Sequence, residues 1–550
     1  MTELIIAVAG LLAVATTAAV APRLRIAAPL LLVVLGIVLS FLPFVPVVDV
    51  DPEWILAGIL PPLLYSASVS MPSMNFRREL GAISGLSVVL VVVSAVVLGG
   101  FFSLVIPDLS FWWGVALGAI VSPTDAVATS IVKRIGVSGR VVSVLDGESL
   151  LNDATALVLL RTAIAGTAAS VSLWGVAGSF AYSVVVALVL GAVVGVGNLR
   201  LRSRVKDPTV NTVLSFTVPF LASIPAELLG ASGLVAAVVA GLVTGHGAPR
   251  HLPPQHRLSE TQNWHTVELV LEGAIFLIMG LELAGIVEDV HDEHSGVGIA
   301  VLVAAGALVL TLLVRAGYIV PLLLGLRRRA RRKVGSKPRI DEMQQRLDGD
   351  PADLPRRTPN SPDPSPERIA RIQTRLRRML SDIDYLAAAP LGWREGSVLV
   401  WAGMRGAVTL AAAQTLPSDT PHRSLLVLVA FLVAAASLLV QGSTLGAFVR
   451  WVRPAPPDDA ALLEEREEID LLLARVREDV TTAAHGDDRP TALPDRPVDA
   501  EIAVIEAQRA AVLDARDDGT YSAPSLASAL TYLDATQMSL QIKSELTDQE

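Results

Sequence analysis

Apolar stretches of about 20 residues recur along the whole chain, and they constrain its fold more than any other feature. A helix of that length crosses ~30 Å of hydrocarbon, and 52% of the 550 residues are hydrophobic. Because a backbone in lipid must satisfy its own hydrogen bonds, the fold class is predicted to be an all-α polytopic membrane protein. Thirteen transmembrane helices are predicted, at 3–21, 24–45, 53–70, 80–106, 109–132, 141–166, 172–198, 208–228, 231–247, 264–286, 296–326, 395–416 and 424–449.

Charges in the loops predict the orientation of these spans. Basic residues such as Arg23 and Arg200 lie in alternate loops, whereas the other loops carry acidic residues such as Asp108 and Glu288. The positive-inside rule therefore places the N-terminus outside and the C-terminal tail in the cytoplasm. The predicted location is the cell membrane.

The chain is predicted to have two domains. Residues 1–450 form a transmembrane domain that includes a basic cytoplasmic insertion at 327–394, between spans eleven and twelve. Residues 451–550 form an acidic tail with helical periodicity at 459–483, 498–516 and 523–547. The tail has a net charge of -13 and the remainder +4, so nucleic acid is excluded as a partner of the tail.

The insertion begins with six basic residues between 327 and 333 and continues with a Pro-rich, disorder-prone stretch at 351–366. An amphipathic helix follows, and its apolar stripe consists of Ile369, Ile372, Leu376, Leu380 and Ile383. Our preferred interpretation is a helix lying on anionic lipid headgroups. The alternative is a cytoplasmic helix packed on the tail.

Ionisable residues at membrane depth predict a functional site. A charge in the bilayer core costs ~2.5–3.5 kcal/mol or more, so each one requires a reason. Four such residues lie near the middle of a span, and Glu148 lies about one turn from the middle of span six. The four are Asp125, Asp153, Arg315 and Arg405.

Two spans are predicted to be interrupted at comparable depth. In span five, Pro123 removes a backbone donor next to Thr124 and Asp125. In span twelve, glycines and an arginine at 403–406 interrupt an apolar run. Because seven spans separate them, the two cross the membrane in opposite directions, which is typical of inverted-repeat transporters with two crossed helices and a midplane site. The alternatives are an ordinary proline kink and close packing at the glycines.

Span six carries five polar groups within eight residues. Asp146, Ser149 and Asp153 share one helical face, and Glu148 and Asn152 share the adjacent face. Such a segment cannot face lipid, so it requires a hydrated cavity or cationic partners. A buried network that only packs helices is the structural alternative.

The buried arginines predict ion pairs. Arg315 is always charged and requires a buried carboxylate, for which Glu148 is the candidate. Arg405 is interpreted as a structural counter-charge beside the site, with Asp125 held by it or by backbone donors. Span ten carries His265, Glu268 and Glu272 near its cytoplasmic end, and these residues either line an entry funnel or form a polar interface at the end of the span.

Three motifs resemble the monovalent cation:proton antiporter family, which contains bacterial sodium/proton antiporters and animal sodium/proton exchangers. Residues 146–153, DGESLLND, resemble its Gly-Glu-Ser-x-x-Asn-Asp signature. Residues 122–128 are similar to the Thr-Asp-Pro-Val segment of its unwound fifth helix, and 403–408 to the Arg-Gly-Ala motif of its twelfth. The resemblance covers about residues 5–450.

The resemblance implies that Asp153 binds cation and proton alternately, and that Glu148 pairs with Arg315 to stabilise the core. The ion-binding set is expected to be Asp153, Asn152, Ser149, Thr124 and Asp125, supported by Arg405 and Pro123. The family is typically a homodimer that moves its core by an elevator-like step. Two positions depart from its pattern: Ala126 stands where many members have Pro, and Ser66 stands where members often have Glu.

The predicted function is exchange of a monovalent cation for protons, with Na⁺ as the first candidate and Li⁺ or K⁺ as alternatives. One carboxylate cannot hold a proton and a cation together, so the two fluxes are expected to be coupled. Because Arg315 should neutralise Glu148 and Asn152 is uncharged, Asp153 alone remains to cycle, and exchange is expected to be electroneutral and one-to-one. No cofactor is expected, and no Gly-x-Ser-x-Gly or His-Glu-x-x-His motif suggests an enzyme. The alternative is a monovalent cation channel, although repeated filter residues are absent from the sequence.

Overall fold

The computed structural model describes residues 2–24, 26–43, 50–168, 173–292, 296–348, 366–456, 459–485 and 497–547. Throughout these residues the regular secondary structure is helical, without strands. The chain divides into two compact units. Most of the Pro-rich stretch at 351–366 lies outside the described residues.

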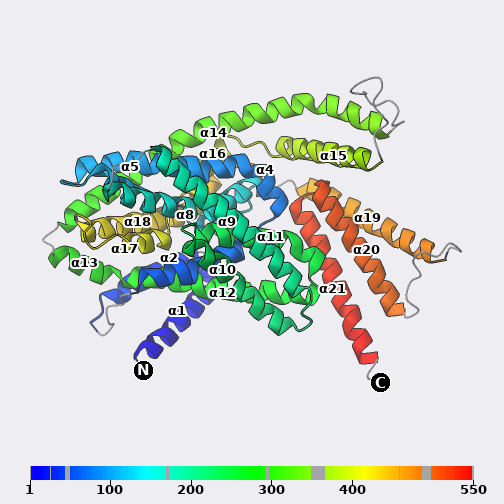
Figure 1. Cartoon of the computed structure of the whole chain (residues 1–550), viewed down its shortest axis with the longest axis horizontal. Helices are drawn as coiled ribbons and strands as arrows, with labels where there is room; N and C mark the ends of the chain where they lie inside the picture. Colours follow the sequence, from blue (N-terminus) through cyan, green and yellow to red (C-terminus); the bar gives the residue numbers. More distant parts are fainter. Residues whose placement is uncertain are drawn as a thin grey trace. The chain divides into compact units, whose positions relative to one another are not determined.

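The first unit comprises Met1–Gly247, Ser259–Leu323 and Leu391–Pro456. Its helices, three of which continue into the second unit, are α1 (Thr2–Leu24), α2 (Ala28–Ser40), η1 (Trp54–Ile59), α3 (Leu60–Ser70), α4 (Ser73–Ser84), η2 (Gly85–Leu90), α5 (Val91–Val105), α6 (Phe111–Ile120), α7 (Val127–Ile135), α8 (Gly139–Ala168), α9 (Leu173–Arg202), α10 (Pro208–Leu228), α11 (Gly233–His251), α12 (Pro254–Leu281), α13 (Leu283–Asp292), α14 (Val297–Asp348), α16 (Trp393–Trp401), α17 (Ala407–Gln414) and α18 (Arg423–Val452) (Figure 1).

Each predicted span coincides with one of these helices or with consecutive ones. By length and composition, seven segments of the described chain are long and apolar enough to cross a membrane: Leu4–Leu24, Ser73–Val105, Gly178–Arg202, Pro208–Leu228, Pro254–His291, Val297–Gln344 and Arg423–Val452. The predicted fifth and twelfth spans fall short of that length because each is broken into two short helices. The total of thirteen spans therefore stays a prediction.

Local chemistry explains several helix ends. Asp207 begins α10 because its carboxylate Oδ1 accepts hydrogen bonds from the amides of Thr209 and Val210, at 2.7 and 3.0 Å. Pro208 follows at the first helical position, where no amide hydrogen is needed. Gly136 ends α7 in the left-handed conformation, with φ of 78°, which a residue with a Cβ rarely adopts.

Two short π-helical segments interrupt predicted spans three and four. These are η1 before α3 and η2 between α4 and α5. Segment η2 packs against α8, and the Ser87 hydroxyl donates a hydrogen bond to the Glu148 carbonyl at 3.2 Å. Such segments often occur at functional sites, and nothing in the hydrophobic pattern predicted them.

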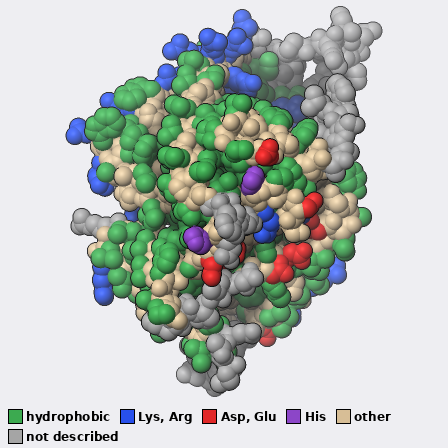
Figure 2. All heavy atoms as spheres, turned by 90° about the vertical axis from the view of Figure 1, so that its left-hand side faces the viewer, with side chains coloured by type: hydrophobic (Ala, Val, Ile, Leu, Met, Phe, Trp, Pro, Cys, Tyr) green, Lys and Arg blue, Asp and Glu red, His purple; other side chains and the backbone are tan. Residues whose placement is uncertain are grey.

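Large hydrophobic side chains cover much of the surface, as contact with lipid requires. Leu104, Leu228 and Leu302 are 88%, 82% and 75% exposed. Figure 2 shows that hydrophobic side chains dominate one face, whereas charged side chains gather in patches.

The second unit comprises Ala248–Leu258, Leu324–Pro390 and Pro457–Glu550. Its helices are the end of α14, α15 (Pro366–Ala388), α19 (Asp459–His485), α20 (Pro497–Asp518) and α21 (Ala523–Thr547). The last three coincide with the predicted tail helices and pack together as a bundle (Figure 1). The insertion and the tail thus share one compact unit.

The structure favours the alternative interpretation of α15, a helix packed on the tail, over a helix lying on lipid headgroups. Leu376 and Ile383, from its apolar stripe, are only 5% and 3% exposed, and α15 packs on α20. The Ser381 hydroxyl donates a hydrogen bond to the Gly519 carbonyl just beyond α20. The tail thus covers part of this stripe, at Leu376 and Ile383, whereas Ile372 and Leu380 stay partly exposed.

Candidate functional site

The break in the fifth predicted span exposes backbone groups at its centre. Helix α6 ends at Ile120 and α7 begins at Val127, with Pro123 between them. The Asp125 amide donates a hydrogen bond to the Met404 carbonyl at 2.8 Å. The Asp125 carboxylate accepts one from the Val127 amide, also at 2.8 Å, and thereby satisfies a free donor at the start of α7.

The twelfth predicted span is broken where expected, between α16 and α17. Arg405 is 2% exposed, and its Nε donates to the Val121 carbonyl at 2.9 Å; its Nη1 donates to the Gly403 carbonyl. Arg405 thus satisfies carbonyls that both breaks leave free. No ion pair joins it to Asp125 within the described residues, so the backbone donor of Val127 holds that carboxylate.

The two breaks lie directly against each other at glycines. A Cβ on Gly406 would overlap the Asp125 carboxylate, and a Cβ on Gly403 would overlap the Arg315 guanidinium. Gly406 therefore permits the close approach of the two breaks, whereas Gly403 makes room for the Arg315 side chain of α14.

Glu148 and Arg315 form a buried bidentate ion pair. Arg315 Nη1 and Nη2 lie 2.5 and 2.8 Å from Glu148 Oε1 and Oε2, and both residues are 1% exposed. Arg315 Nε donates to the Leu399 carbonyl at 2.8 Å, and the Thr124 hydroxyl donates to Glu148 Oε1 at 3.0 Å. These additional bonds satisfy most of the polar atoms that the pair buries, which makes a buried pair tolerable.

Asn152 presents a buried oxygen with no partner. Its Nδ2 donates to the Thr124 carbonyl at 3.0 Å and to the Thr124 hydroxyl at 2.7 Å. Its Oδ1 is buried and accepts no hydrogen bond from the described residues, although the side chain is only 1% exposed. An orphaned buried acceptor costs free energy unless a ligand or water fills its place.

Asp153 follows Asn152 in α8 and is 8% exposed. Within the described part of the chain it forms neither an ion pair nor a hydrogen bond. The Asp125 carboxylate lies within electrostatic range of it, and neither acidic group has an ion-pair partner in the described chain. A cation bound there would relieve the repulsion.

The remaining predicted ligands are partly engaged by the protein itself. The Ser149 hydroxyl donates to the Asp146 carbonyl at 3.1 Å in its own helix, and the Thr124 hydroxyl is held between Glu148 and Asn152. Each oxygen keeps acceptor capacity, because a hydroxyl has two lone pairs. Hydroxyl, amide and carboxylate oxygens are the ligands that a hard monovalent cation prefers. No group of three or more His, Asp or Glu among the described residues is placed to hold a metal ion.

Two carboxylates of α12 face this region. Glu272 lies within electrostatic range of Asp125, and Glu268 lies close to Ser66. Position 66 is one of the two at which the sequence departs from the family pattern. Both open interpretations, a funnel or an interface, are compatible with these contacts.

Sequence reasoning missed two further buried pairs, because it counted their arginines as loop charges. Arg202 is 0% exposed and binds Glu260 through two hydrogen bonds of 2.8 Å. Arg140 is 4% exposed and binds Glu79, with Nε 2.5 Å from Oε1. A glutamate near the end of a neighbouring span was the available signal. Ser437 and Gln441 of α18, fully buried in an apolar span, were also missed, although their spacing of four places them on one face.

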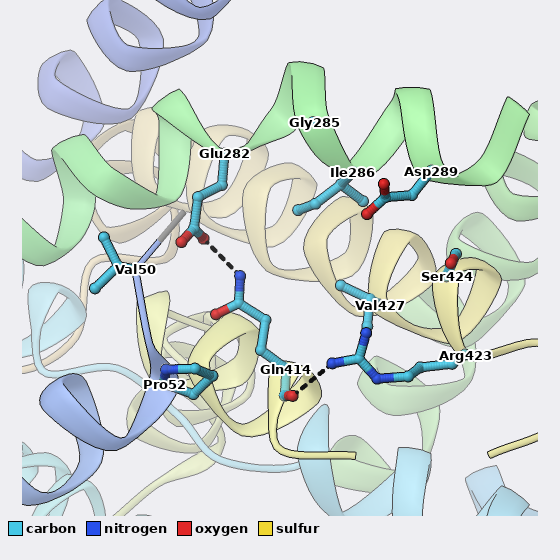
Figure 3. A pocket seen from close by; sticks show the side chains of 10 residues that line it. All are labelled: Val50, Pro52, Glu282, Gly285, Ile286, Asp289, Gln414, Arg423, Ser424 and Val427. Carbon is cyan, nitrogen blue, oxygen red and sulfur yellow. Dashed lines mark hydrogen bonds between the residues drawn. The ribbon is translucent and has the colours of Figure 1, made fainter. Parts of the chain in front are cut away.

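A cavity lies at the C-terminal end of α17 (Figure 3). Gln414 Nε2 donates to Glu282 Oε2 at 2.9 Å, and Arg423 Nη2 donates to the Gln414 carbonyl at 2.8 Å. Asp289 of α13 lines the same cavity. None of the predicted ion-site residues lines it.

Comparisons with known proteins give a consistent family. The family described as sodium/hydrogen exchanger, transmembrane, matches residues 10–340 and 372–451. An uncharacterized Na⁺/H⁺ exchanger of Mycobacterium tuberculosis is 29% identical over 86% of this chain and 78% of its own length. The low-affinity Na⁺/H⁺ antiporter NhaS1 of a Synechocystis species is 26% identical over 79% of this chain and 71% of its own.

The fold resembles that of a solved transporter. The sodium proton antiporter MjNhaP1 from Methanocaldococcus jannaschii aligns with a TM-score of 0.56 over 82% of this chain and 99% of its own. Sequence identity in that alignment is 18%, so the comparison supports the fold alone. The chemistry of the site is inferred from the residues of this chain.

Proposed function

The chain belongs to the transmembrane sodium/hydrogen exchanger family, and on this basis we propose that it exchanges a monovalent cation for protons across the cell membrane. The observation that carries the proposal is the group of oxygens around Asp153. Asp153 has an unpaired carboxylate, the preceding residue Asn152 carries the orphaned Oδ1, and the Asp125 carboxylate lies within electrostatic range of Asp153. Such a group attracts one positive charge, and a proton or a cation supplies it.

Each predicted residue has a proposed role. Asp153 binds the cation or the proton, and Asn152 and Ser149 contribute neutral oxygens. Thr124 contributes to the cation shell and, through its bond to Glu148, fixes the unwound segment. Asp125 lowers the electrostatic potential of the site without entering an ion pair. Pro123 and Arg405 maintain the break that exposes these groups.

The balance of charge supports electroneutral exchange. Arg315 neutralises Glu148 directly, and Arg405 offsets Asp125 in the same region without touching it. Among these residues, Asp153 then remains as the one carboxylate whose charge no arginine offsets. Its charge is cancelled equally by one proton or by one Na⁺, Li⁺ or K⁺ ion, so one-for-one exchange moves no net charge.

The remaining proposals concern topology and assembly. Thirteen spans with inverted repeats, an external N-terminus and a cytoplasmic tail fit the alternation of basic and acidic loops. That orientation places the cavity beside Gln414 on the external side, where Glu282 and Asp289 would attract cations toward the membrane. A homodimer is the assembly that the family resemblance favours.

The test is counter-ion flux in proteoliposomes that contain the purified protein and a pH-sensitive dye. Adding Na⁺, Li⁺ or K⁺ outside should drive protons out of vesicles that hold no other pathway, and the order of the three rates identifies the substrate. A channel would instead carry the cation down its own gradient without a counter-ion. Cation flux that is unaffected by removal of the proton gradient, and that leaves the internal pH unchanged, would therefore favour the channel.

A further inference from the structure

The broken span between α16 and α17 leaves backbone groups that no helix satisfies. Such groups in the interior of a membrane protein require a partner, because lipid offers none. Two of them, the Trp401 carbonyl and the Arg405 amide, lie on either side of the break. Both find their partner on α18.

The partners are Ser437 and Gln441, which lie one helical turn apart and are 0% and 1% exposed. Gln441 Nε2 donates to the Trp401 carbonyl at 3.0 Å. The Ser437 hydroxyl accepts from the Arg405 amide at 3.0 Å and donates to Gln441 Oε1. The donors and acceptors of the two side chains thus form one continuous chain that spans the break.

This chain of bonds ends at the ion site. The segment between Trp401 and Arg405, which Ser437 and Gln441 hold, also contains Met404. The Met404 carbonyl accepts a hydrogen bond from the Asp125 amide at 2.8 Å. Gly406, next to Arg405, lies against the Asp125 carboxylate. A shift of this segment must therefore shift Asp125 relative to Asp153.

We propose that Ser437 and Gln441 are positioning residues of the ion site, which set the place of Asp125 by fixing the broken backbone of the opposite span. The inference rests on the proposed exchange function and adds to it a determinant of cation affinity that touches neither the ion nor its ligands. Simple helix packing would not require it, because two apolar side chains would pack α18 as well.

The experiment compares Ser437→Ala and Gln441→Met with Ser443→Ala in the proteoliposome assay. Ser443 is the matched control, because it lies on the same helix, is exposed, and bonds only to carbonyls of its own helix. Loss of one buried bond at the break should raise the apparent KM for the cation roughly tenfold or more, the size expected when a buried polar group loses its partner. Ser443→Ala should leave the KM unchanged.

Conservative rescue separates positioning from stability. Ser437→Thr retains the hydroxyl and should restore a KM near that of the unaltered protein, even where thermal stability stays lower. Ser437→Ala removes one oxygen atom and is expected to fold, so it provides the primary test. The second measurement on this variant is the rise in its Tm when the cation is added. A reduced Tm with an unchanged KM and an unchanged cation-induced rise would overturn the proposal and leave a packing role. If the unaltered protein moves no protons against cations, the proposed function itself fails; altered flux through a working protein tests this inference alone.

Discussion

At the scale of single residues, the site is defined by what its side chains lack. Glu148 and Arg315 satisfy each other and are further bonded to Thr124 and Leu399. Asp153 and the Oδ1 of Asn152 have no such partners in the described chain. Unsatisfied polar groups on consecutive residues of a buried helix are costly, and a bound ion, proton or water would complete them.

The variant Asp153→Asn should abolish exchange while the protein still folds and inserts. Asparagine keeps the shape but carries no charge and cannot release a proton, so neither substrate can be held in competition. Proton efflux driven by an added cation is the measurement, and Asp51→Asn, an exposed aspartate, is the control. Exchange by Asp153→Asn at a rate near that of the control would remove Asp153 from its role.

The variant Glu148→Gln should chiefly destabilise the fold. It leaves the Arg315 guanidinium buried and unpaired, and breaking a buried ion pair costs about 3–5 kcal/mol. The Tm in detergent should fall strongly. Arg161→Gln is the matched control, because the Arg161–Glu227 pair is 60% and 40% exposed, and such surface pairs contribute about 0–1 kcal/mol. Equal Tm changes in both variants would contradict the structural role of the buried pair.

At the scale of elements, two interrupted helices make one site. Each break frees backbone groups, and each supplies partners for the other: Asp125 N–H for the Met404 carbonyl, and Arg405 for the Val121 carbonyl. The breaks therefore stabilise each other, and neither is expected to persist alone.

The variant Gly406→Ala tests this mutual fit. Its methyl group would overlap the Asp125 carboxylate, so it should separate the two breaks and reduce exchange by at least an order of magnitude. Gly317→Ala on α14 is the control, because nothing lies within 4 Å of a Cβ at that position. Both variants are compared by cation-driven proton flux at equal amounts of inserted protein, and equal rates would show that the contact is unimportant.

The positions of the breaks could be predicted from the sequence, whereas their partners could not. Pro123 and the glycines at 403 and 406 act locally, through a missing donor or a missing Cβ, so a single sequence reveals them. The partners of Arg405 depend on which carbonyls a neighbouring helix exposes, and that is a property of the assembled fold. For the same reason the apolar stripe of α15 predicted a non-polar partner without distinguishing the bilayer from α20.

At the scale of the whole molecule, the charge balance around the site determines whether transport moves net charge, and the second unit can be removed to test whether transport requires it. The region around the two breaks contains Arg315 and Arg405 together with Glu148, Asp125 and Asp153, so these five residues carry one net negative charge when the site is empty. Glu272 of α12 is a further carboxylate near Asp125. If Glu272 also bound and released a proton during transport, the exchange would move net charge and would depend on the membrane potential.

Exchange should be independent of membrane potential. The site binds either one proton or one monovalent cation, so a complete cycle moves no net charge. A potential of 100 mV is worth ~2.3 kcal/mol for each charge moved and should therefore not alter the steady-state ion gradient. Vesicles clamped with valinomycin and K⁺ at zero and at negative potential provide the measurement, using Na⁺ or Li⁺ as substrate. A gradient that shifts with potential would show that a second charge moves, with Asp125 and Glu272 as the first residues to change.

Removal of residues 457–550 should preserve cation-dependent exchange, because the ion-site residues all lie in the first unit. Within the second unit it removes the partners of Arg250, which lie 2.8 Å away at Asp514 and Asp517. It also uncovers the apolar stripe of α15. The truncated protein should thus become sensitive to protease at α15, measured by limited digestion against the full chain. A truncated protein that inserts correctly but moves no ions would show that the tail is required for transport.

The burial of Arg140 and Arg202 has a consequence for how the chain is made. Glu79 precedes Arg140 by 61 residues, so that partner already exists when Arg140 leaves the ribosome. Glu260 follows Arg202 by 58 residues, so Arg202 emerges without its partner. If the orientation proposed above holds, Arg202 is expected to act during membrane insertion as a free positive charge that retains its loop in the cytoplasm. After Glu260 is synthesised, the same guanidinium would become part of the interior. One arginine would then serve first as a signal for orientation and later as a structural element.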